Sequence, residues 1–244
     1  MNPLLITDIG LISYTEAYAL QRRLTAARKA EALGDVLLLC EHPHVITLGR
    51  NAKRENLLVS EHVLRQKGIE LHATNRGGDI TYHGPGQIVG YPILNLGVIK
   101  RDVGWYVRRL EEAMIRGTAD FGLTAFRIPG RTGIWVNPTA KPGAAEEKLA
   151  AIGVHISRWV TSHGFAYNVS TDLRFFDLII PCGIAERKAT SLEKLLSRNV
   201  ALDEVKPRLG YHFAELFSFV PRRISSEELT SFLSGFEEKV STSL

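Results

Sequence analysis

The stretch that most constrains the fold of this chain runs from Arg76 to Asn95, RGGDITYHGPGQIVGYPILN. Four glycines fall within its first eleven residues, and the part from Ile88 to Leu94 is largely apolar. Glycine lacks a Cβ, so it permits positive φ and lets a ligand lie against backbone N–H groups. The pattern predicts a glycine-rich loop that leads into a buried strand and forms a ligand cradle. The alternative is a tight connection between two strands, in which glycine only allows the turn.

The composition is that of an ordinary globular protein. The chain has 244 residues, of which 45% are hydrophobic and 23% charged. We expect a single domain over residues 1–244. No apolar run is long enough to span a bilayer and the N-terminus has no targeting pattern, so we expect a cytoplasmic protein without a membrane partner. The formal charge of +4 comes from scattered basic residues, which argues against nucleic-acid binding but allows an acidic protein partner.

Hydrophobic periodicity and capping signals predict strands and helices in irregular alternation. Helices are expected at residues 13–34, 60–67, 102–117, 190–196, 203–219 and 225–240, with Val103 and Phe232 on buried faces. Strands are expected at 4–6, 36–40, 45–49, 69–74, 88–94, 124–128, 133–136, 148–154, 159–169 and 175–180. The predicted fold class is α/β (α+β), a mixed central sheet flanked by helices.

The two cysteines have different surroundings. Cys40 ends an aliphatic run, which predicts a buried structural thiol. Two thiols are too few for a disulfide framework or a structural zinc site, and His42 and His44 have no further ligands nearby, so no metal is expected. Cys182 stands in a turn, PCGI, that can expose the sulfur and present backbone N–H groups as an oxyanion hole. An inert thiol in a turn fits the same residues equally well.

A nucleophilic cysteine needs a base or a nearby cation. The candidates are His83, His163 and Lys148, and the sequence gives no distances with which to choose between them. Lys148 stands at the end of a loop and leads into an apolar strand. A lysine at such a position is usually solvated. If Lys148 is held beside Cys182 in an apolar pocket, it can instead exchange protons near neutrality.

Four segments, RGGDITYHGPGQIVGYPILNL, KLAAIGV, HGFAYNV and PCGI, occur in this order and at characteristic separations. On these motifs, the chain from about Leu4 to Phe219 resembles the lipoyl(octanoyl) transferase family, the octanoyl-carrier-protein:protein octanoyltransferases. The resemblance implies the catalytic-domain fold of biotin and lipoate protein ligases. Two features depart from the family pattern: Tyr167 stands where an aliphatic residue is expected, and the loop at residues 137–147 is longer than usual.

The resemblance also implies roles for residues. Cys182 would accept the acyl group as a thioester, and Lys148 would stabilise its thiolate. The donor would be octanoyl-acyl carrier protein, the acceptor a lysine on lipoyl domains of 2-oxoacid dehydrogenases or on glycine cleavage H protein, and no cofactor would be needed. This transfer is the first step of endogenous protein lipoylation. The expected substrate contacts are Arg76, Gly77, Gly78, Asp79, Ile80, Thr81, Tyr82, His83, Ala151, Ile152, Gly153, Gly164, Phe165 and Ala166.

Three other functions remain open at this point. An ATP-dependent lipoate or biotin protein ligase of the same fold would make an acyl-adenylate and would need no cysteine. A non-enzymatic module would use the glycine loop only to hold a carrier protein or lipid. A cysteine hydrolase would let water resolve the acyl-enzyme.

Overall fold

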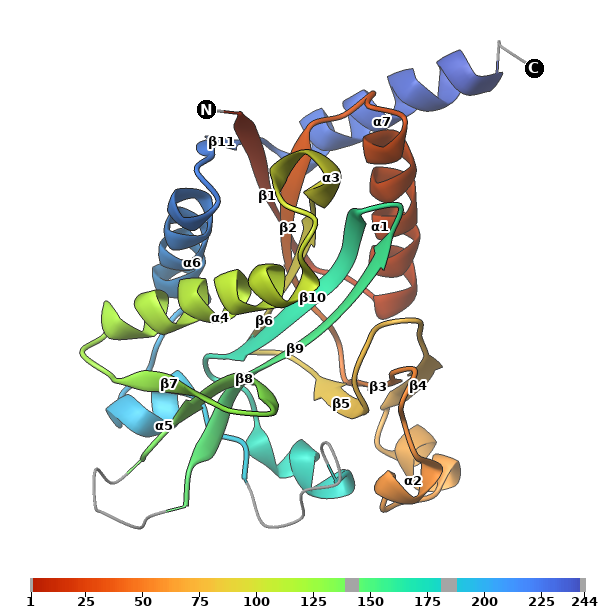
Figure 1. The fold of residues 1–244 in the computed structure, drawn as a ribbon. Coiled ribbons are helices and arrows are strands. Elements are labelled where there is room, and N and C mark those ends of the chain that lie inside the picture. Colours follow the sequence, from red (N-terminus) through yellow and green to blue (C-terminus); the bar gives the residue numbers. More distant parts are fainter. Residues whose placement is uncertain (1, 139–144, 181–187, 242–244) are drawn as a thin grey trace.

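The computed structural model describes residues 2–138, 145–180 and 188–241 (Figure 1). Its strands are β1 (Pro3–Leu11), β2 (Asp35–Glu41), β3 (Val45–Leu48), β4 (Glu70–Ala73), β5 (Ile80–His83), β6 (Gln87–Ile93), β7 (Ala125–Ile128), β8 (Arg131–Val136), β9 (Glu147–Ser157), β10 (Val160–Asn168) and β11 (Val220–Arg223). Its helices are α1 (Tyr14–Lys29), α2 (Glu61–Gln66), α3 (Leu96–Ile99), α4 (Val103–Ala119), α5 (Leu192–Leu196), α6 (Leu202–Leu216) and α7 (Ser226–Ser241), with 3-10 turns η1 (Arg54–Asn56) and η2 (Leu173–Leu178).

Two sheets form the frame. Among the described residues, the larger sheet has eight strands in the order β11-β1-β2-β6-β10-β9-β8-β7, and the smaller has three in the order β4-β3-β5. Both sheets are mixed, since β1 pairs in parallel with β2 and β11 while β6 pairs antiparallel with β2 and β10, and β3 pairs in parallel with β4 but antiparallel with β5. The predicted fold class, a mixed sheet flanked by helices, is therefore confirmed. Within the described residues, no helix has the length and apolar character needed to cross a bilayer.

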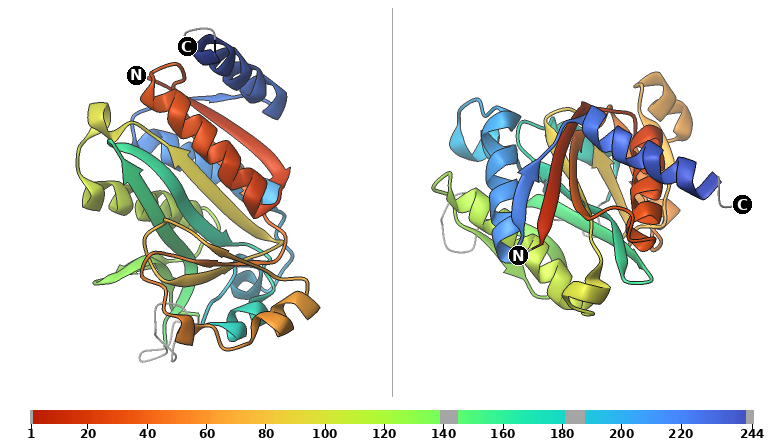
Figure 2. Two further views of the ribbon diagram at one scale, coloured as in Figure 1. Left: turned by 90° about the vertical axis from the view of Figure 1, so that its right-hand side faces the viewer. Right: turned by 90° about the horizontal axis from the view of Figure 1, so that it is seen from above.

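Helices cover both faces of the large sheet (Figure 2). Helices α4 and α6 pack on one face, where Leu37 and Leu39 of β2 point, and α1 and α7 pack on the other, where Val36, Leu38 and Cys40 point. Because successive side chains of a strand alternate between faces, a central strand covered on both sides is apolar throughout. Cys40 is fully buried, as predicted, and burial raises the pKa of its thiol.

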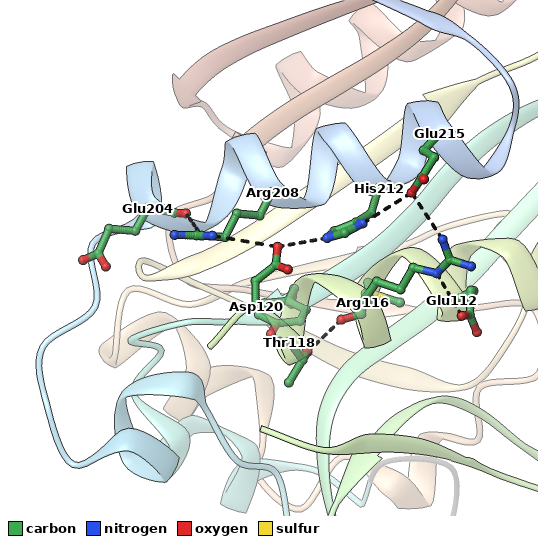
Figure 3. A network of polar contacts seen from close by, with 10 residues as sticks. Glu112, Arg116, Thr118, Asp120, Glu204, Arg208, His212 and Glu215 are labelled. Atoms are coloured by element: carbon green, nitrogen blue, oxygen red, sulfur yellow. Dashed lines mark hydrogen bonds and ion pairs between the residues drawn. The ribbon is translucent and has the colours of Figure 1, made fainter. Parts of the chain in front are cut away.

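A network of ion pairs joins the side chains of α4 and α6 (Figure 3). His212 Nε2 lies 2.9 Å from Asp120 Oδ2, and Arg116 lies 3.1 Å from Glu112 and 3.2 Å from Glu215. Exposed pairs of this kind each contribute little to the free energy of unfolding. Below them, the buried Thr118 hydroxyl contacts the Tyr167 hydroxyl at 2.7 Å.

The small sheet has its own core. Ile46, Leu64, Ile80 and Tyr82 pack there with Ile179, and the Tyr82 ring stacks on Phe175 with ring centroids 5.0 Å apart. The aromatic residues of η2 thus cover the core of the small sheet. This core is separate from the two cores of the large sheet.

Several predicted elements differ from the structure. Residues 80–83 form β5, although they were predicted as part of a loop, and α3 and β11 were not predicted. Residues 175–180, predicted as a strand, are mostly the 3-10 turn η2, capped by Asp172, whose Oδ1 accepts from the Arg174 N–H. The apolar side chains here follow a turn rather than a strand because they pack onto one small core.

Helix ends and faces also differ. Helix α1 starts at the predicted capping box of Ser13 and Glu16 but ends at Lys29, before Gly34. Glu31, with a φ of 57°, takes the left-handed conformation that ends the helix, a position usually given to glycine. Val103 and Phe232 were predicted on buried faces but are 46% and 42% exposed, because α4 and α7 meet the sheet through other residues.

Candidate active site

A cavity of about 420 Å³ lies between the two sheets. The segment from Arg76 to His83 forms one wall, and β9 and β10 form the opposite wall with Lys148. All the predicted substrate contacts except Tyr82 line this cavity, whereas the Tyr82 side chain points into the small-sheet core. The volume is within the range of small-ligand sites. Whether these residues touch a substrate remains a prediction.

The glycines of the first wall let backbone pack against backbone. The Gly77 N–H donates to Val154 O at 2.9 Å, and the Arg50 N–H donates to Arg76 O at 2.9 Å, so the loop is fastened to β9 and to the end of β3. A Cβ on Gly153 would lie 2.8 Å from Gly77 O. Gly78 has a φ of 88°, which only glycine adopts readily. Both interpretations of this stretch therefore apply in part: the glycines connect strands closely, and the loop lines a cavity.

Arg76 holds this wall to β3. Its Nη2 donates to Thr47 O at 2.6 Å and to Thr47 Oγ1 at 2.9 Å, and its Nη1 donates to Gly77 O at 3.1 Å. The side chain is buried, so these bonds form in an environment where they are strong. The guanidinium also places a positive charge beside the cavity.

Two of the three candidate proton-transfer residues are neutral histidines. Burial, with the charges of His42 and Arg76, lowers the pKa of His83 to about 3, and burial, with the charges of Arg76 and His155, lowers the pKa of His163 to about 3. His83 Nδ1 lies 2.8 Å from Gln87 Oε1, and His163 Nε2 lies 2.7 Å from Asn75 Oδ1. Since each ring nitrogen faces an amide oxygen, it carries the hydrogen. These histidines can orient groups but do not exchange protons near neutrality.

Lys148, the third candidate, lies in β9 opposite Trp135 of β8. Its Nζ is 5.2 Å from the centroid of the Trp135 ring, a distance at which the ring stabilises a cation. Its backbone N–H donates to Lys188 O at 2.9 Å, and its carbonyl accepts from the Thr190 N–H at 2.9 Å. Lys148 is therefore anchored between β8 and residues 188–190.

Cys182 lies outside the described residues, and the predicted pairing of Cys182 with Lys148 remains a prediction. The described chain on either side borders the cavity: Phe176 and Lys188 both line it. On the N-terminal side of residues 181–187, the Ile180 N–H donates to Asn56 O at 2.8 Å. The loop at 137–147 lies partly outside the described residues as well.

The sequence missed some of the cavity lining and misjudged one position. Tyr14 and Trp135 line the cavity although they lie outside the four motifs, and Tyr91 lines it from the strand part of the first motif. Sequence reasoning missed them because aromatic residues at the start of a helix or within a strand are usually core. Tyr167 does not line the cavity; it is fully buried under α4, so this departure from the family pattern does not alter the described lining.

Comparison with known proteins agrees with this fold and cavity. The family model for the lipoyl protein ligase A/B catalytic domain matches residues 13–214. The solved structure of a bi-partite lipoate protein ligase and its E2 lipoyl domain from Thermoplasma acidophilum superposes with a TM-score of 0.72 over 98% of this chain and 93% of that chain, at 17% identity. At 17% identity, this similarity supports a shared fold and nothing more specific. The fold is that of a lipoyl protein ligase A/B catalytic domain.

Sequence relatives give the narrower family. An octanoyltransferase of Solibacter usitatus is 54% identical over 88% of this chain and 93% of its own length. An octanoyltransferase of Acidobacterium capsulatum is 53% identical over 77% of this chain and 78% of its own length. The chain belongs to the octanoyltransferase family, a family of acyltransferases.

Proposed function

We propose that this chain transfers an octanoyl group from octanoyl-acyl carrier protein to a lysine of a lipoyl domain, through a thioester on Cys182. The observation that carries the proposal is the cavity between the sheets, which combines apolar walls with Lys148. Lys188, six residues after Cys182 in the sequence, accepts from the Lys148 backbone N–H at 2.9 Å, which supports the pairing of Cys182 with Lys148 in this proposal.

The walls suit a medium-length acyl chain. Ile152, Val154, Phe165 and Ala166 present apolar surface on one side, and Ile80 presents it on the other. Burying each methylene contributes about 0.8 kcal/mol, so the seven carbons beyond the octanoyl carbonyl contribute at most about 5–6 kcal/mol. This binding free energy would hold the acyl group while the donor leaves and the acceptor arrives.

In the first half-reaction, the Cys182 thiolate attacks the donor thioester carbonyl. The new C–S bond forms, the C–S bond to the phosphopantetheine arm breaks, and the leaving thiolate takes a proton from the Lys148 ammonium. The Trp135 ring favours that ammonium before the reaction, which keeps the proton available. Backbone N–H groups would stabilise the transient oxyanion.

In the second half-reaction, the neutral amine of an acceptor lysine attacks the acyl-enzyme thioester. An amide bond forms, the C–S bond to Cys182 breaks, and neutral Lys148 takes the amine proton. The thiolate and the ammonium are thereby restored. Exchange of one thioester for another is nearly balanced and amide formation from a thioester is downhill, so ATP is not required.

Intact-protein mass spectrometry tests the covalent scheme. Incubation with octanoyl-acyl carrier protein should add one octanoyl mass to the wild-type chain at Cys182, while Cys182→Ser and Lys148→Ala should lose transfer. A wild-type chain that transfers octanoyl without ever carrying the adduct would exclude the scheme. Transfer that requires ATP and persists in Cys182→Ala would instead favour a ligase of the same fold.

A further inference from the structure

A second hollow, of about 550 Å³, lies between α1 and the hairpin of β9 and β10. We call it the α1–hairpin groove. Arg22 and Lys29 of α1 line one side, and His155 and Arg158 of the hairpin line the other. The hairpin and α1 lie side by side in Figure 1, and α1 packs against β10. No acidic side chain lines the groove within the part of the chain that the structure describes.

The cations of this groove differ from their neighbours on α1. Arg23 is paired with Glu237 at 2.6 Å and Arg28 with Asp35 at 2.8 Å. Among the described residues, neither Arg22, Lys29 nor Arg158 forms an ion pair. Burial and the nearby charge of Arg158 lower the pKa of Lys29, which indicates that two like charges face each other here. Such a cluster is stabilised when a negative group enters it.

The floor of the groove holds buried polar atoms that lack a partner. Gln21 is fully buried, and its Nε2 makes no hydrogen bond in the structure. The Thr25 hydroxyl and His155 Nδ1 are likewise buried and without a partner. A buried polar atom left unsatisfied costs about 1–3 kcal/mol, so a polar group that enters the groove beside these three atoms can relieve part of that cost.

The groove shares a wall with the cavity that holds Lys148. Gln21 Oε1 accepts from the backbone N–H of His163 at 2.9 Å, and the Tyr18 ring, which lines the groove, stacks on the His163 ring with centroids 5.5 Å apart. Seven residues of β9 separate His155 in the groove from Lys148, which is about 23 Å of extended strand. A partner seated in the groove therefore sits near the cavity but far from its reactive end.

We infer that the α1–hairpin groove docks an acidic surface of the acyl-carrier protein that brings the octanoyl group. This inference rests on the proposed function. The separation favours the donor over the acceptor. An acceptor must place a lysine side chain at Lys148 and so must sit directly over it, whereas a carrier delivers its acyl group on a phosphopantetheine arm several times longer. Charge complementarity of this kind raises the rate of encounter and weakens with salt.

The test compares two octanoyl thioesters, octanoyl-acyl carrier protein and octanoyl-pantetheine, which carries the thioester without a protein. The variant is Arg22→Glu/Arg158→Glu, in which both substituted residues are exposed. The control is Lys67→Glu/Arg101→Glu, which changes the net charge equally at exposed positions outside the groove. Initial rates of acyl-enzyme formation are measured for each protein at 25 mM to 400 mM salt.

We expect the groove variant to raise the KM for octanoyl-acyl carrier protein about tenfold or more, to leave the rate with octanoyl-pantetheine within about twofold, and to flatten the salt dependence. The control should behave as wild type. An unchanged KM for the carrier or an equal loss with both thioesters would each overturn the inference. If the wild-type chain takes octanoyl from neither thioester, the proposed function itself fails, which is a separate outcome.

Discussion

Gly133 and Lys148 are in such close contact that a Cβ placed on Gly133 would lie 2.8 Å from Lys148 Cε. The same Cβ would also overlap the carbonyl oxygen of Ala150. The Gly133 N–H donates to Glu111 Oε1 at 3.0 Å, so the backbone of β8 cannot easily move away. The path of the Lys148 side chain thus depends on the absence of a side chain at Gly133.

Gly133→Ala should therefore impair both stability and transfer. Gly133 has a φ of 117°, which an alanine adopts only with strain, and the overlap with Ala150 adds to it. We expect a loss of about 1–3 kcal/mol in the free energy of unfolding by urea titration, and a greater than tenfold slower transfer. Gly122→Ala is the matched control, because Gly122 has a φ of 75° and open space around it. Equal losses in the two variants would contradict crowding at Lys148.

Replacing Trp135 tests the cation–π contact with Lys148. Trp135→Leu removes the ring that stabilises the ammonium and should slow transfer by about 3- to 30-fold, which corresponds to about 0.7–2 kcal/mol. Trp135→Phe keeps an aromatic face and should retain most of the activity. The pH profile of acyl-enzyme formation is the measurement, since a purely structural role for Trp135 would lower the rate at every pH without moving the profile.

Ala151→Leu should shorten the acyl cavity. Ala151 lines the cavity on β9 and is only partly buried, so a larger side chain projects into the space rather than into the core. We expect transfer of octanoyl to fall at least about tenfold while transfer of butanoyl stays near the wild-type rate, because three added carbons displace part of a longer chain. Rates measured for thioesters of four to ten carbons give the result. A uniform loss across all lengths would contradict this role.

The buried histidines predict a loss of stability in mild acid. In the folded state the pKa of His83 and that of His163 are lowered to about 3, below the unfolded value near 6.5. Between these values the unfolded chain binds protons that the folded chain does not, so the free energy of unfolding falls as pH drops below about 6.5. Each histidine contributes about 1.4 kcal/mol per pH unit in that window. Urea titrations at pH 7.5, 6.0 and 5.0 measure the slope, which should be shallower in His163→Gln.

The predictable parts of the fold are those in which local chemistry and tertiary packing agree. The capping box at Ser13 starts α1, and the continuous burial along β2 follows from a strand that is apolar on both faces. The sequence did not predict strand β5, because its residues, Ile80 to His83, lie between glycines in a stretch with the composition of a loop. Its pairing with β3 depends on residues far away in the chain.

The site shows the same division. Residues of three of the four motifs line one cavity from separate strands, whereas PCGI lies outside the described residues. The groups that surround Lys148 were not predictable, because the contact with Trp135 and the close approach of Gly133 depend on how β8 pairs with β9, and that pairing shifts register between Ile134 and Trp135. Register shifts of one residue leave no mark in composition or periodicity.

The two walls of the cavity belong to sheets with separate cores, and this division has a thermodynamic consequence. The small sheet packs around Tyr82 and Phe175, so local opening of this sheet exposes apolar residues that the cores of the large sheet do not include. If the acyl chain binds between the two walls as proposed, we expect its binding free energy to add to the stability of the small sheet. Amide protons of β3 and β5 then report occupancy of the cavity: their exchange with solvent slows when the enzyme is loaded.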